Sequence, residues 1–313
     1  MRIVFMGTPD FAYVPLNALI ESNRHDVVAV ITQPDKANTR GRKIVYSPVK
    51  ALAIESKLDI LQPANIKNID AINAISKLNP DIVVVVAYGQ LLPLEILNMP
   101  KYGCINIHAS LLPRYRGSAP IHWSIINGEV ETGVTTMYMD QGMDTGDIIY
   151  QEKVKIGDQT TVGELYEELA VLGTNLLLKT LADLETGTAP RKKQDEKLSS
   201  YAPLLTKDMA RINWNNTTSN IINLIRGTNP WPVAYTHYHD QKVKIYTAKS
   251  YESPEEIDYK PGTIIRYEKN KGLLIKTMDS SLYLQVIQFS NKKRMHIDDY
   301  LKGNTIEIGH TLD

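Results

Sequence analysis

The sequence predicts a doubly wound α/β domain with a mostly parallel, Rossmann-like sheet, followed by a small open β-barrel. In the first half of the 313 residues, strand-like and helix-like segments alternate, which is typical of parallel sheets with crossover helices. The valine-rich run Asp81–Ala87 indicates a strand that is covered on both faces. After residue 241, short strands separated by turns indicate an antiparallel barrel of the oligonucleotide-binding type.

The strands of the first domain are expected where apolar runs meet turn residues. They are residues 3–6, 27–31, 81–87 and 104–108. Gly7 to Asp10 follow the first run, so a helix is expected from about Phe11 to Ser22. Ser47 and Pro48 begin a second helix, because serine is a favoured N-cap and proline a favoured first residue.

The segment Gly163–Leu184 carries leucines along one stripe, which predicts an amphipathic helix at the end of the first domain. The polar, mostly charged residues after it indicate a linker. We therefore predict a first domain over residues 1–189, a linker over 190–205 and a barrel-like domain over 206–313. In the last of these we expect a helix at 219–226 and strands at 242–248, 262–266, 272–277 and 281–288.

The composition, with 43% hydrophobic and 22% charged residues, is that of an ordinary globular protein. A formal net charge of zero gives no support to binding of nucleic acid over the whole surface, so such contacts must rest on local patches. The single cysteine, Cys104, excludes a disulfide framework and a zinc site of several cysteines. Neither a signal peptide nor a membrane span is predicted, and we expect a cytoplasmic monomer.

The carboxyl ends of the strands are the expected ligand site. The first turn holds one glycine, Gly7, and the chain has neither G-x-G-x-x-G nor a Walker loop, so no phosphate cradle is predicted. Ligands of doubly wound sheets still bind beyond the strand ends. Asn106 and His108 lie there, two residues apart on one strand face. Asp144 lies in a turn rich in aspartate and glycine that is able to fold back over the strand ends.

An asparagine, a histidine and an aspartate suit acyl transfer to an amine. Asn106 and a protonated His108 are able to donate hydrogen bonds to a developing oxyanion. Asp144 would favour the imidazolium and accept a proton through water. Each residue also has a structural interpretation, as a satisfied strand-end histidine, a locally bonded asparagine and a turn aspartate. The spacing alone leaves open whether Asp144 meets His108.

Three separated strings resemble the formyltetrahydrofolate-dependent formyltransferases and hydrolases. They are N-x-H at 106–108, SLLPxYRGxAP at 110–120 and MDxGxDxG at 139–146. The resemblance implies that the asparagine, histidine and aspartate described above are catalytic, that 10-formyltetrahydrofolate is the formyl donor and that no metal takes part. The residues it assigns to the folate pocket are Val86, Ala87, Tyr88, Gly89, Ser110, Leu111, Leu112, Pro113 and Asp140.

Further strings resemble the branch of this family that formylates methionyl-tRNA. They are FMGTPDFA at 5–12, SYAP at 200–203 and NPWP at 229–232. The resemblance covers essentially the whole chain, and it implies that the second domain helps to hold the tRNA.

The basic loop at residues 36–50 agrees with that branch, because it contains five cations and no carboxylate. Guanidinium groups pair well with phosphate. The resemblance implies that Arg40, Arg42 and Lys43 bind the acceptor stem of the initiator tRNA. The same composition also fits a solvated basic loop.

Two other interpretations stay open. The first is an enzyme with the same site, either a formyltransferase for an amino sugar nucleotide or a formyltetrahydrofolate hydrolase; the basic loop and the barrel disfavour both. The second is a non-catalytic RNA-binding protein, which three converging polar residues in a pocket would disfavour.

Overall fold

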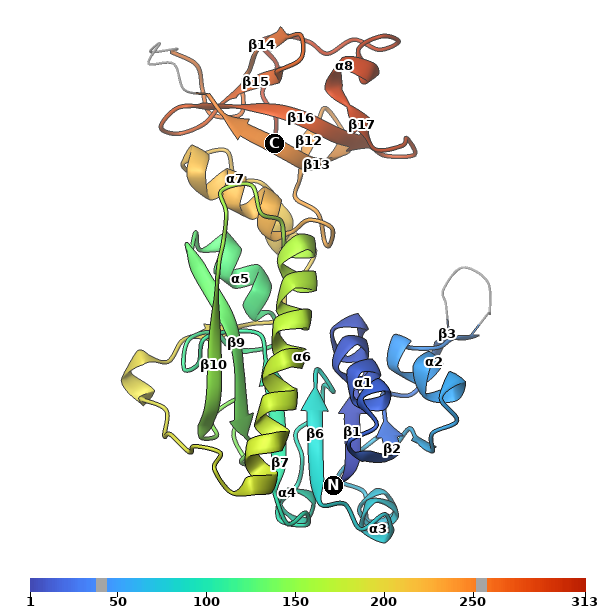
Figure 1. Ribbon diagram of the computed structural model, residues 1–313. Coiled ribbons are helices and arrows are strands. Elements are labelled where there is room, and N and C mark those ends of the chain that lie inside the picture. The colour runs from blue at the N-terminus through green and yellow to red at the C-terminus, as the bar shows by residue number, and fades with distance from the viewer. Residues whose placement is uncertain (38–43, 252–257) are drawn as a thin grey trace. The chain divides into compact units, whose positions relative to one another are not determined.

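The computed structural model describes residues 1–37, 44–251 and 258–313. The described chain forms two compact units. The first comprises Met1–Pro120, Thr132–Val154 and Tyr166–Ala202, and the second comprises Ile121–Glu131, Lys155–Leu165 and Pro203–Asp313. Figure 1 shows the elements in chain order.

Up to residue 202 the chain contains most of its strands and its longest helix. The strands are β1 (Arg2–Gly7), β2 (Asp26–Ile31), β3 (Lys36–Ala37), β4 (Ile44–Val45), β5 (Ile60–Leu61), β6 (Ile82–Val86), β7 (Cys104–His108), β8 (Arg116–Gly117), β9 (Glu131–Tyr138), β10 (Ile148–Lys155) and β11 (Tyr201–Ala202). The helices are α1 (Asp10–Ser22), α2 (Pro48–Glu55), α3 (Ile69–Lys77), α4 (Leu94–Leu97), α5 (Pro120–Ile126), α6 (Val162–Thr186) and the short η1 (Glu196–Leu198).

The first unit is built on a sheet of seven strands in the order β10-β9-β7-β6-β1-β2-β5. Neighbours from β7 to β5 pair in parallel, and β9 pairs antiparallel with β7. The predicted fold class is confirmed, and each strand expected in this half lies within one residue of its predicted bounds. The antiparallel strands β9 and β10 were not among the expected strands.

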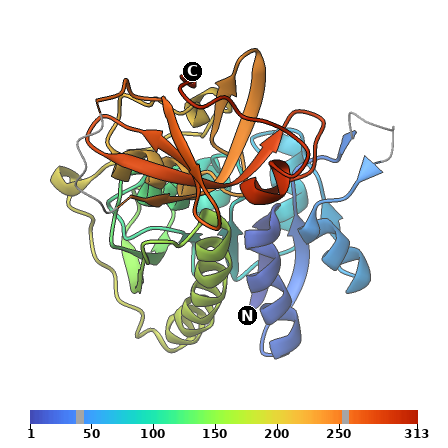
Figure 2. The ribbon, with the colours of Figure 1, turned by 90° about the horizontal axis from the view of Figure 1, so that it is seen from above.

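Burial on both faces explains the unbroken apolar runs of the central strands. On one face, Val4 of β1 packs with Ile75 of α3 and Ile96 of α4 in a single cluster of buried side chains. On the other face α1 and α6 lie side by side (Figures 1 and 2), and the backbone N–H of Phe11 donates to the hydroxyl of Tyr166 at 2.7 Å. Parallel strands covered in this way need apolar residues at every position.

Local signals in the sequence fix the ends of these elements. Ser47 caps α2 as predicted, because its hydroxyl accepts a 3.2 Å hydrogen bond from the N–H of Lys50. Gly7 ends β1 where the chain has no room for a side chain. A Cβ at this position would lie 2.6 Å from Cβ of Ala12 and 2.9 Å from the carbonyl oxygen of Val86.

After residue 202 the pattern changes to a small antiparallel sheet. Its elements are η2 (Asp208–Ala210), α7 (Thr218–Gly227), β12 (Tyr235–Tyr238), β13 (Gln241–Ser250), β14 (Ile264–Glu268), β15 (Gly272–Lys276), β16 (Ser281–Phe289), β17 (Met295–His296) and α8 (Ile297–Tyr300). The sheet order is β12-β13-β16-β15-β14, with β17 also paired to β16. The expected helix and strands are present, but β14 begins two residues later than predicted, because Gly262 turns the chain at φ +91°.

The last residues of the chain close the gap between the two edge strands of this sheet, and we call this closure the seam. On one side, the N–H of Leu312 donates to the carbonyl oxygen of Gly262, just before β14, at 2.9 Å. On the other side, Asp313 exchanges two backbone hydrogen bonds of 3.1 Å with His237 of β12. The seam therefore gives the sheet its barrel-like form.

The interior of the second unit is apolar. It includes Trp214, Ile225 of α7, Ile245 of β13 and Leu284 of β16, all of them buried. Among the described residues, no helix combines the length and the apolar character that a membrane crossing requires.

Candidate active site

Asn106 and His108 project from the carboxyl half of β7, where the sheet places them on one face. Asn106 pairs with Val85 of the parallel neighbour β6 and with Met137 of the antiparallel neighbour β9. Both polar side chains are buried, with 9% of Asn106 and 6% of His108 exposed. Because buried polar groups need partners, their surroundings decide what they are able to do.

The loop between β9 and β10 brings Asp144 to this pair. One carboxylate oxygen, Oδ1, accepts from Nδ2 of Asn106 at 3.4 Å. The other, Oδ2, lies 3.6 Å from Nδ1 of His108 and accepts from the backbone N–H of Gly117 at 2.8 Å. Asp144 has a φ of +57°, a left-handed conformation in which aspartate is tolerated. The structure thus places the amide, the imidazole and the carboxylate together.

The two ring nitrogens of His108 have different neighbours. Nε2 lies 2.9 Å from the carbonyl oxygen of Tyr115 and donates to it, because a carbonyl oxygen only accepts. Nδ1 faces Asp144 beyond direct hydrogen-bond distance. A doubly protonated ring would have an acceptor at each nitrogen, and Nδ1 is the nitrogen with room for another partner.

Asn106 has one polar atom without a partner. Its Oδ1 is buried and makes no hydrogen bond within the described part of the chain. Leaving a buried acceptor unpaired costs about 1–3 kcal/mol. An unpaired buried acceptor beside a histidine and an aspartate is expected in a site where a bound ligand donates the missing hydrogen bond.

The segment after β7, residues 109–117, is held in place by side chains from β9 and β10. The hydroxyl of Thr135 donates to the carbonyl oxygen of Ser110 at 2.6 Å and accepts from the N–H of Leu112 at 3.2 Å. Nε2 of Gln151 donates to the carbonyl oxygen of Leu112 at 2.9 Å. The bond between Leu112 and Pro113 is cis. Leu111, the remaining residue of the predicted SLLP contact, is partly buried in the same segment.

The end of β6 lies beside Asn106 at the same edge of the sheet. Val86 is its last residue, and Ala87 and Gly89 take positive φ values of +47° and +87°. Tyr88 is 2% exposed, and its hydroxyl has no hydrogen-bond partner among the described residues. Burial raises the pKa of Tyr88 to about 12, so the hydroxyl keeps its proton near neutral pH.

Asp140 holds its own loop together. Its Oδ1 accepts from the N–H of Gly142 at 3.0 Å and from the hydroxyl of Thr145 at 2.6 Å. These bonds shape the turn that carries Asp144, so the described contacts of Asp140 are local.

The predicted tRNA contacts Arg40, Arg42 and Lys43 lie outside the described residues. The described chain on either side is anchored. β3 pairs with β4, and Nζ of Lys50 donates both to the carboxylate of Asp35 and, at 2.7 Å, to Oε1 of Gln62. The hydrogen bond from Lys50 lowers the pKa of Asp35.

Comparisons with known proteins identify the family of the chain. A model described as formyl transferase matches residues 1–181, and one described as formyl transferase, C-terminal domain, matches residues 204–305. The methionyl-tRNA formyltransferase of Alkaliphilus metalliredigens is 51% identical over 312 residues, which cover 100% of this chain and 98% of that protein. The one from Clostridioides difficile is 48% identical over 100% of both chains. This chain belongs to the methionyl-tRNA formyltransferase family.

Solved structures of other formyltransferases share the fold of this family member. A sugar 3N-formyltransferase, WlaRD, determined with dTDP and 5-N-formyl-THF, superposes with a TM-score of 0.65 at 22% identity, over 94% of this chain and 99% of that one. An N-formyltransferase from Helicobacter canadensis, in complex with folinic acid and dTDP-3-aminofucose, gives a TM-score of 0.64 at 20% identity, over 91% and 99%. These likenesses concern the fold.

Sequence reasoning missed the segment that joins the two loops of the site. Nε2 of Gln194 donates to the carbonyl oxygens of Asp144 at 2.8 Å and Gly146 at 2.7 Å. Its Oε1 accepts from Nε of Arg116 at 3.1 Å and from Nη2 at 2.8 Å. Gln194 therefore ties the loop of Asp144 to the segment after β7.

Arg116 is held from the same side. Glu196 accepts two hydrogen bonds of 2.8 Å from its guanidinium group, and this contact raises the pKa of Arg116. Tyr201 of β11 pairs with Arg116 of β8. One signal in the sequence pointed to this contact, namely the presence of Arg116 inside the string at residues 110–120. A buried arginine needs a carboxylate as its partner, and the segment 191–200 contains two carboxylates.

Proposed function

We propose that the chain transfers the formyl group of 10-formyltetrahydrofolate to the α-amino group of methionyl-tRNA. The observation that carries this proposal is the meeting of Asn106, His108 and Asp144 at the strand ends of a family member. An asparagine, a histidine and an aspartate are sufficient for attack of an amine on a formyl carbon, and no covalent nucleophile is required.

Asn106 and His108 stabilise the oxyanion that forms when the amine attacks. Nδ2 of Asn106 carries two hydrogens, of which one points to Asp144, and the other is available to the oxyanion. Nδ1 of a protonated His108 is the ring nitrogen that donates to the oxyanion, because Nε2 donates to Tyr115 and Nδ1 lies beyond direct hydrogen-bond distance of Asp144. Donors of this kind are typically worth about 3 kcal/mol of barrier each.

Oδ1 of Asn106 is placed to orient the amine that receives the formyl group. This buried atom has no partner in the described chain, and the attacking α-amino group carries N–H donors. A hydrogen bond between them would satisfy the orphaned acceptor and aim the nitrogen lone pair. The same amide group would therefore hold both reactants.

Asp144 has two tasks in this scheme. Its Oδ2 lies on the side of the imidazole that donates, and the carboxylate accepts, through water, the proton that leaves the attacking nitrogen. The N–H of Gly117 and the amide of Asn106 fix the carboxylate for both tasks. When the oxyanion collapses, the bond between the formyl carbon and N10 of the folate breaks, and N10 takes up a proton so that tetrahydrofolate leaves.

The folate donor occupies the space beyond β6 and β7. In this proposal its pocket is formed by the chain at 86–89 and 110–113 and by Asp140. Structures of the same fold are named for complexes with folates, 5-N-formyl-THF and folinic acid, which supports a folate as the ligand. The positive φ values at Ala87 and Gly89 turn the backbone out of β6, and the carbonyl oxygen of Tyr88 between them accepts from Nε2 of Gln33 at 3.0 Å.

The tRNA meets a different part of the chain. Arg40, Arg42 and Lys43 bind phosphates of the acceptor stem, and the residues from 206 to 313 form a domain that supports the tRNA, with residues 1–189 as the catalytic domain and 190–205 as the linker. The protein acts as a cytoplasmic monomer. The support for the tRNA contacts is the relation to full-length methionyl-tRNA formyltransferases and the cationic composition of the loop.

Formyl transfer assays with labelled donor and three acceptors test the proposal. Charged initiator tRNA is expected to be formylated, whereas a nucleotide-linked amino sugar and water alone are not. Efficient transfer to the sugar, or hydrolysis without an amine, would favour one of the alternatives. His108→Ala and Asp144→Asn are expected to lose turnover by about 10²–10³-fold while remaining folded.

A further inference from the structure

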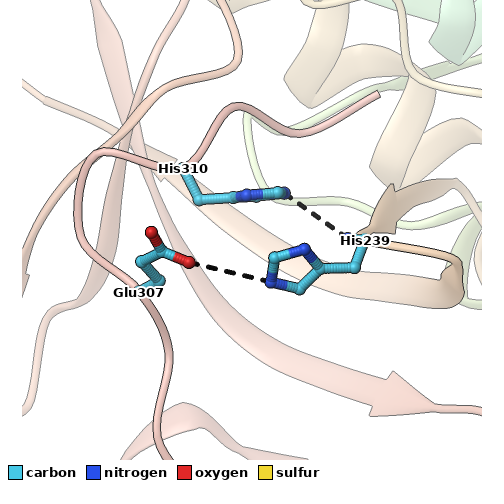
Figure 3. Close-up of side chains that lie close together, drawn as sticks. All are labelled: His239, Glu307 and His310. Atoms are coloured by element: carbon cyan, nitrogen blue, oxygen red, sulfur yellow. Dashed lines mark hydrogen bonds and ion pairs between the residues drawn. The ribbon is translucent and has the colours of Figure 1, made fainter.

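Three side chains that suit a metal ion meet at the seam of the second unit. His239 lies at the tip of the β12–β13 hairpin, and Glu307 and His310 lie in the last segment of the chain. One donor atom from each residue lies within 4.8 Å of the others. Figure 3 shows the three side chains turned toward one another.

The donor atoms have only long contacts in the described part of the chain. Nε2 of His239 is 3.8 Å from Oε2 of Glu307, and a ring nitrogen of His310 accepts from the backbone N–H of His239 at 3.4 Å. The imidazole rings are close together, with centroids 4.2 Å apart. Contacts of this length are weak as hydrogen bonds. The ligand atoms of one tetrahedral ion lie about 3.3–3.5 Å from one another at usual bond lengths, which is close to the 3.8 Å between Nε2 of His239 and Oε2 of Glu307.

The surrounding structure holds the three residues in place. The N–H of Glu307 donates to the hydroxyl of Tyr238 at 2.9 Å, and the ring of Tyr238 also packs edge-on against both imidazoles. The carbonyl oxygen of His310 accepts from the N–H of Ile264 at 2.9 Å. The cluster is therefore not a chance meeting of long, unsupported side chains.

His239 occupies a position that the backbone does not favour. Tyr238 pairs with Gln241, so the hairpin loop is two residues long, and His239 has a φ of +49°. Glycine and asparagine are the usual residues in such a loop. A histidine held at positive φ is a form of local strain that often accompanies a functional contact.

The geometry points to a site for one divalent transition-metal ion of the zinc class, bound by His239, Glu307 and His310 with water as the remaining ligand. Two imidazoles and one carboxylate are borderline ligands that suit Zn²⁺ or Co²⁺, whereas Mg²⁺ prefers six oxygen ligands. The bound ion joins the hairpin of β12 and β13 to the chain end that pairs with Gly262 and His237. It therefore fastens the seam.

Metal titration of the full chain, freed of metal by chelation, tests this site. We expect one equivalent of Zn²⁺ to bind and to raise the Tm, and Co²⁺ to give the visible absorption of a tetrahedral ion; Mg²⁺ does neither. Loss of one ligand in His310→Gln, or in His239→Asn, which suits the positive φ, is expected to weaken binding by at least about 100-fold. Tyr238→Phe, which removes only the bond to Glu307, is expected to weaken it by about 10-fold.

Two matched variants separate this site from other histidines. His237→Gln changes a histidine of β12, two residues before His239, whose ring packs against Tyr235. His25→Gln removes a second group of donors, in which Nδ1 of His25 lies 3.4 Å from the N-terminal amine and 3.6 Å from Glu185. Both variants should bind Zn²⁺ like the unaltered chain. The inference would be overturned if the unaltered chain did not bind Zn²⁺. It would also be overturned if the folded His310→Gln variant, freed of metal, bound Zn²⁺ as tightly as the unaltered chain, or if His25→Gln lost the binding instead.

Discussion

Asn106 and Cys104 stand two residues apart on the same face of β7, yet their surroundings give them opposite properties. The Sγ of Cys104 points to the carbonyl oxygen of Ile96, and burial raises the pKa of the thiol to about 12. It is an inert part of the core. Asn106 is nearly as buried but meets Asp144 and keeps one acceptor unpaired. The difference between a core residue and the proposed oxyanion donor therefore arises within two positions of one strand.

This contrast gives a kinetic prediction. Asn106→Ala removes the oxyanion donor and the unpaired acceptor together, so kcat is expected to fall by about 10²–10³-fold. The KM for the folate donor should change much less, because the folate pocket extends over other segments. Steady-state kinetics with both substrates measure this division.

Cys104→Ala is the matched control for that experiment. It truncates a buried side chain on the same strand face without touching the proposed chemistry, so kcat should stay within a few-fold of the unaltered chain. A similar fall in both variants would mean that Asn106 acts only by shaping the strand.

Glu268 of β14 shows how one carboxylate contributes to the second unit. It accepts from the hydroxyl of Tyr283 at 2.6 Å and lies 2.9 Å from Nζ of Lys271 and 2.7 Å from Nε of Arg266. These contacts, that of Tyr283 first, lower the pKa of Glu268 to about 2. A carboxyl with a lowered folded-state pKa stabilises the fold above its unfolded pKa, and this contribution is lost as pH falls toward the folded value.

We therefore expect Glu268→Gln to lower the free energy of unfolding by about 1–2 kcal/mol at pH 7. The difference between the two proteins should shrink as pH falls from about 4.5 toward 2. Denaturant unfolding at several pH values measures it. A difference that stays constant over this range would show that the charge of Glu268 is not its source.

The strands β1, β2 and β6 could be predicted because their cores are uninterrupted apolar runs, and burial on both faces requires such runs, whereas the two-residue parallel strand β5 was too short to stand out. The segment Glu131–Tyr138 contains three threonines and a glycine, so its pattern did not stand out as a strand, although it carries Thr135 to the site. The contact between Asp144 and Asn106 could not be predicted from the sequence either. The contact depends on where the hairpin of β9 and β10 pairs with the sheet, and the spacing of residues along the chain does not determine that position.

The segment 191–202 illustrates the same limit. Its residues 191–200 are polar and mostly charged, which is typical of a linker, and the stretch 190–205 was interpreted as one. In the structure, Gln194 and Glu196 contact Arg116, which lies 78 and 80 residues earlier in the chain. Polar contacts over such separations leave no periodic pattern that sequence reasoning could find.

Gln194 is therefore expected to act as a positioning residue. Gln194→Leu removes both bonds to the loop of Asp144 and both bonds to Arg116, so the backbone of the loop that carries the carboxylate is held less firmly. A displacement of about 1 Å at a reacting group is able to cost on the order of 10²-fold in rate. We expect kcat to fall by about 10–100-fold, with smaller changes in the KM of either substrate.

Gln194→Glu separates positioning from general stability. Its carboxylate keeps the two acceptor contacts with Arg116 but has no N–H for the carbonyl oxygens of Asp144 and Gly146. It should therefore retain most of the thermal stability and still have a reduced kcat. If Gln194→Glu has normal turnover, the bonds to the Asp144 loop do not contribute to catalysis.

The two substrates of the whole protein make different demands on it. The folate is a small molecule that a concave site encloses, whereas the tRNA is a polyanion whose binding releases counterions. A chain with a formal net charge of zero has no general attraction for RNA. In the proposed function, the cations of the loop at 36–50 supply a local attraction that brings the acceptor end to the reaction site.

This division predicts how salt affects the variants. Arg40→Ala should raise the KM for methionyl-tRNA and leave the KM for the folate unchanged. The slope of log affinity for tRNA against log salt concentration should become shallower by roughly 0.7–0.9 for each phosphate that the variant no longer neutralises, and Arg42→Ala should act in the same direction. Arg24→Ala, which removes an exposed arginine outside the loop, is the control. If its salt slope changes as much as that of Arg40→Ala, the attraction comes from total charge, and the loop at 36–50 has no special part in binding the tRNA.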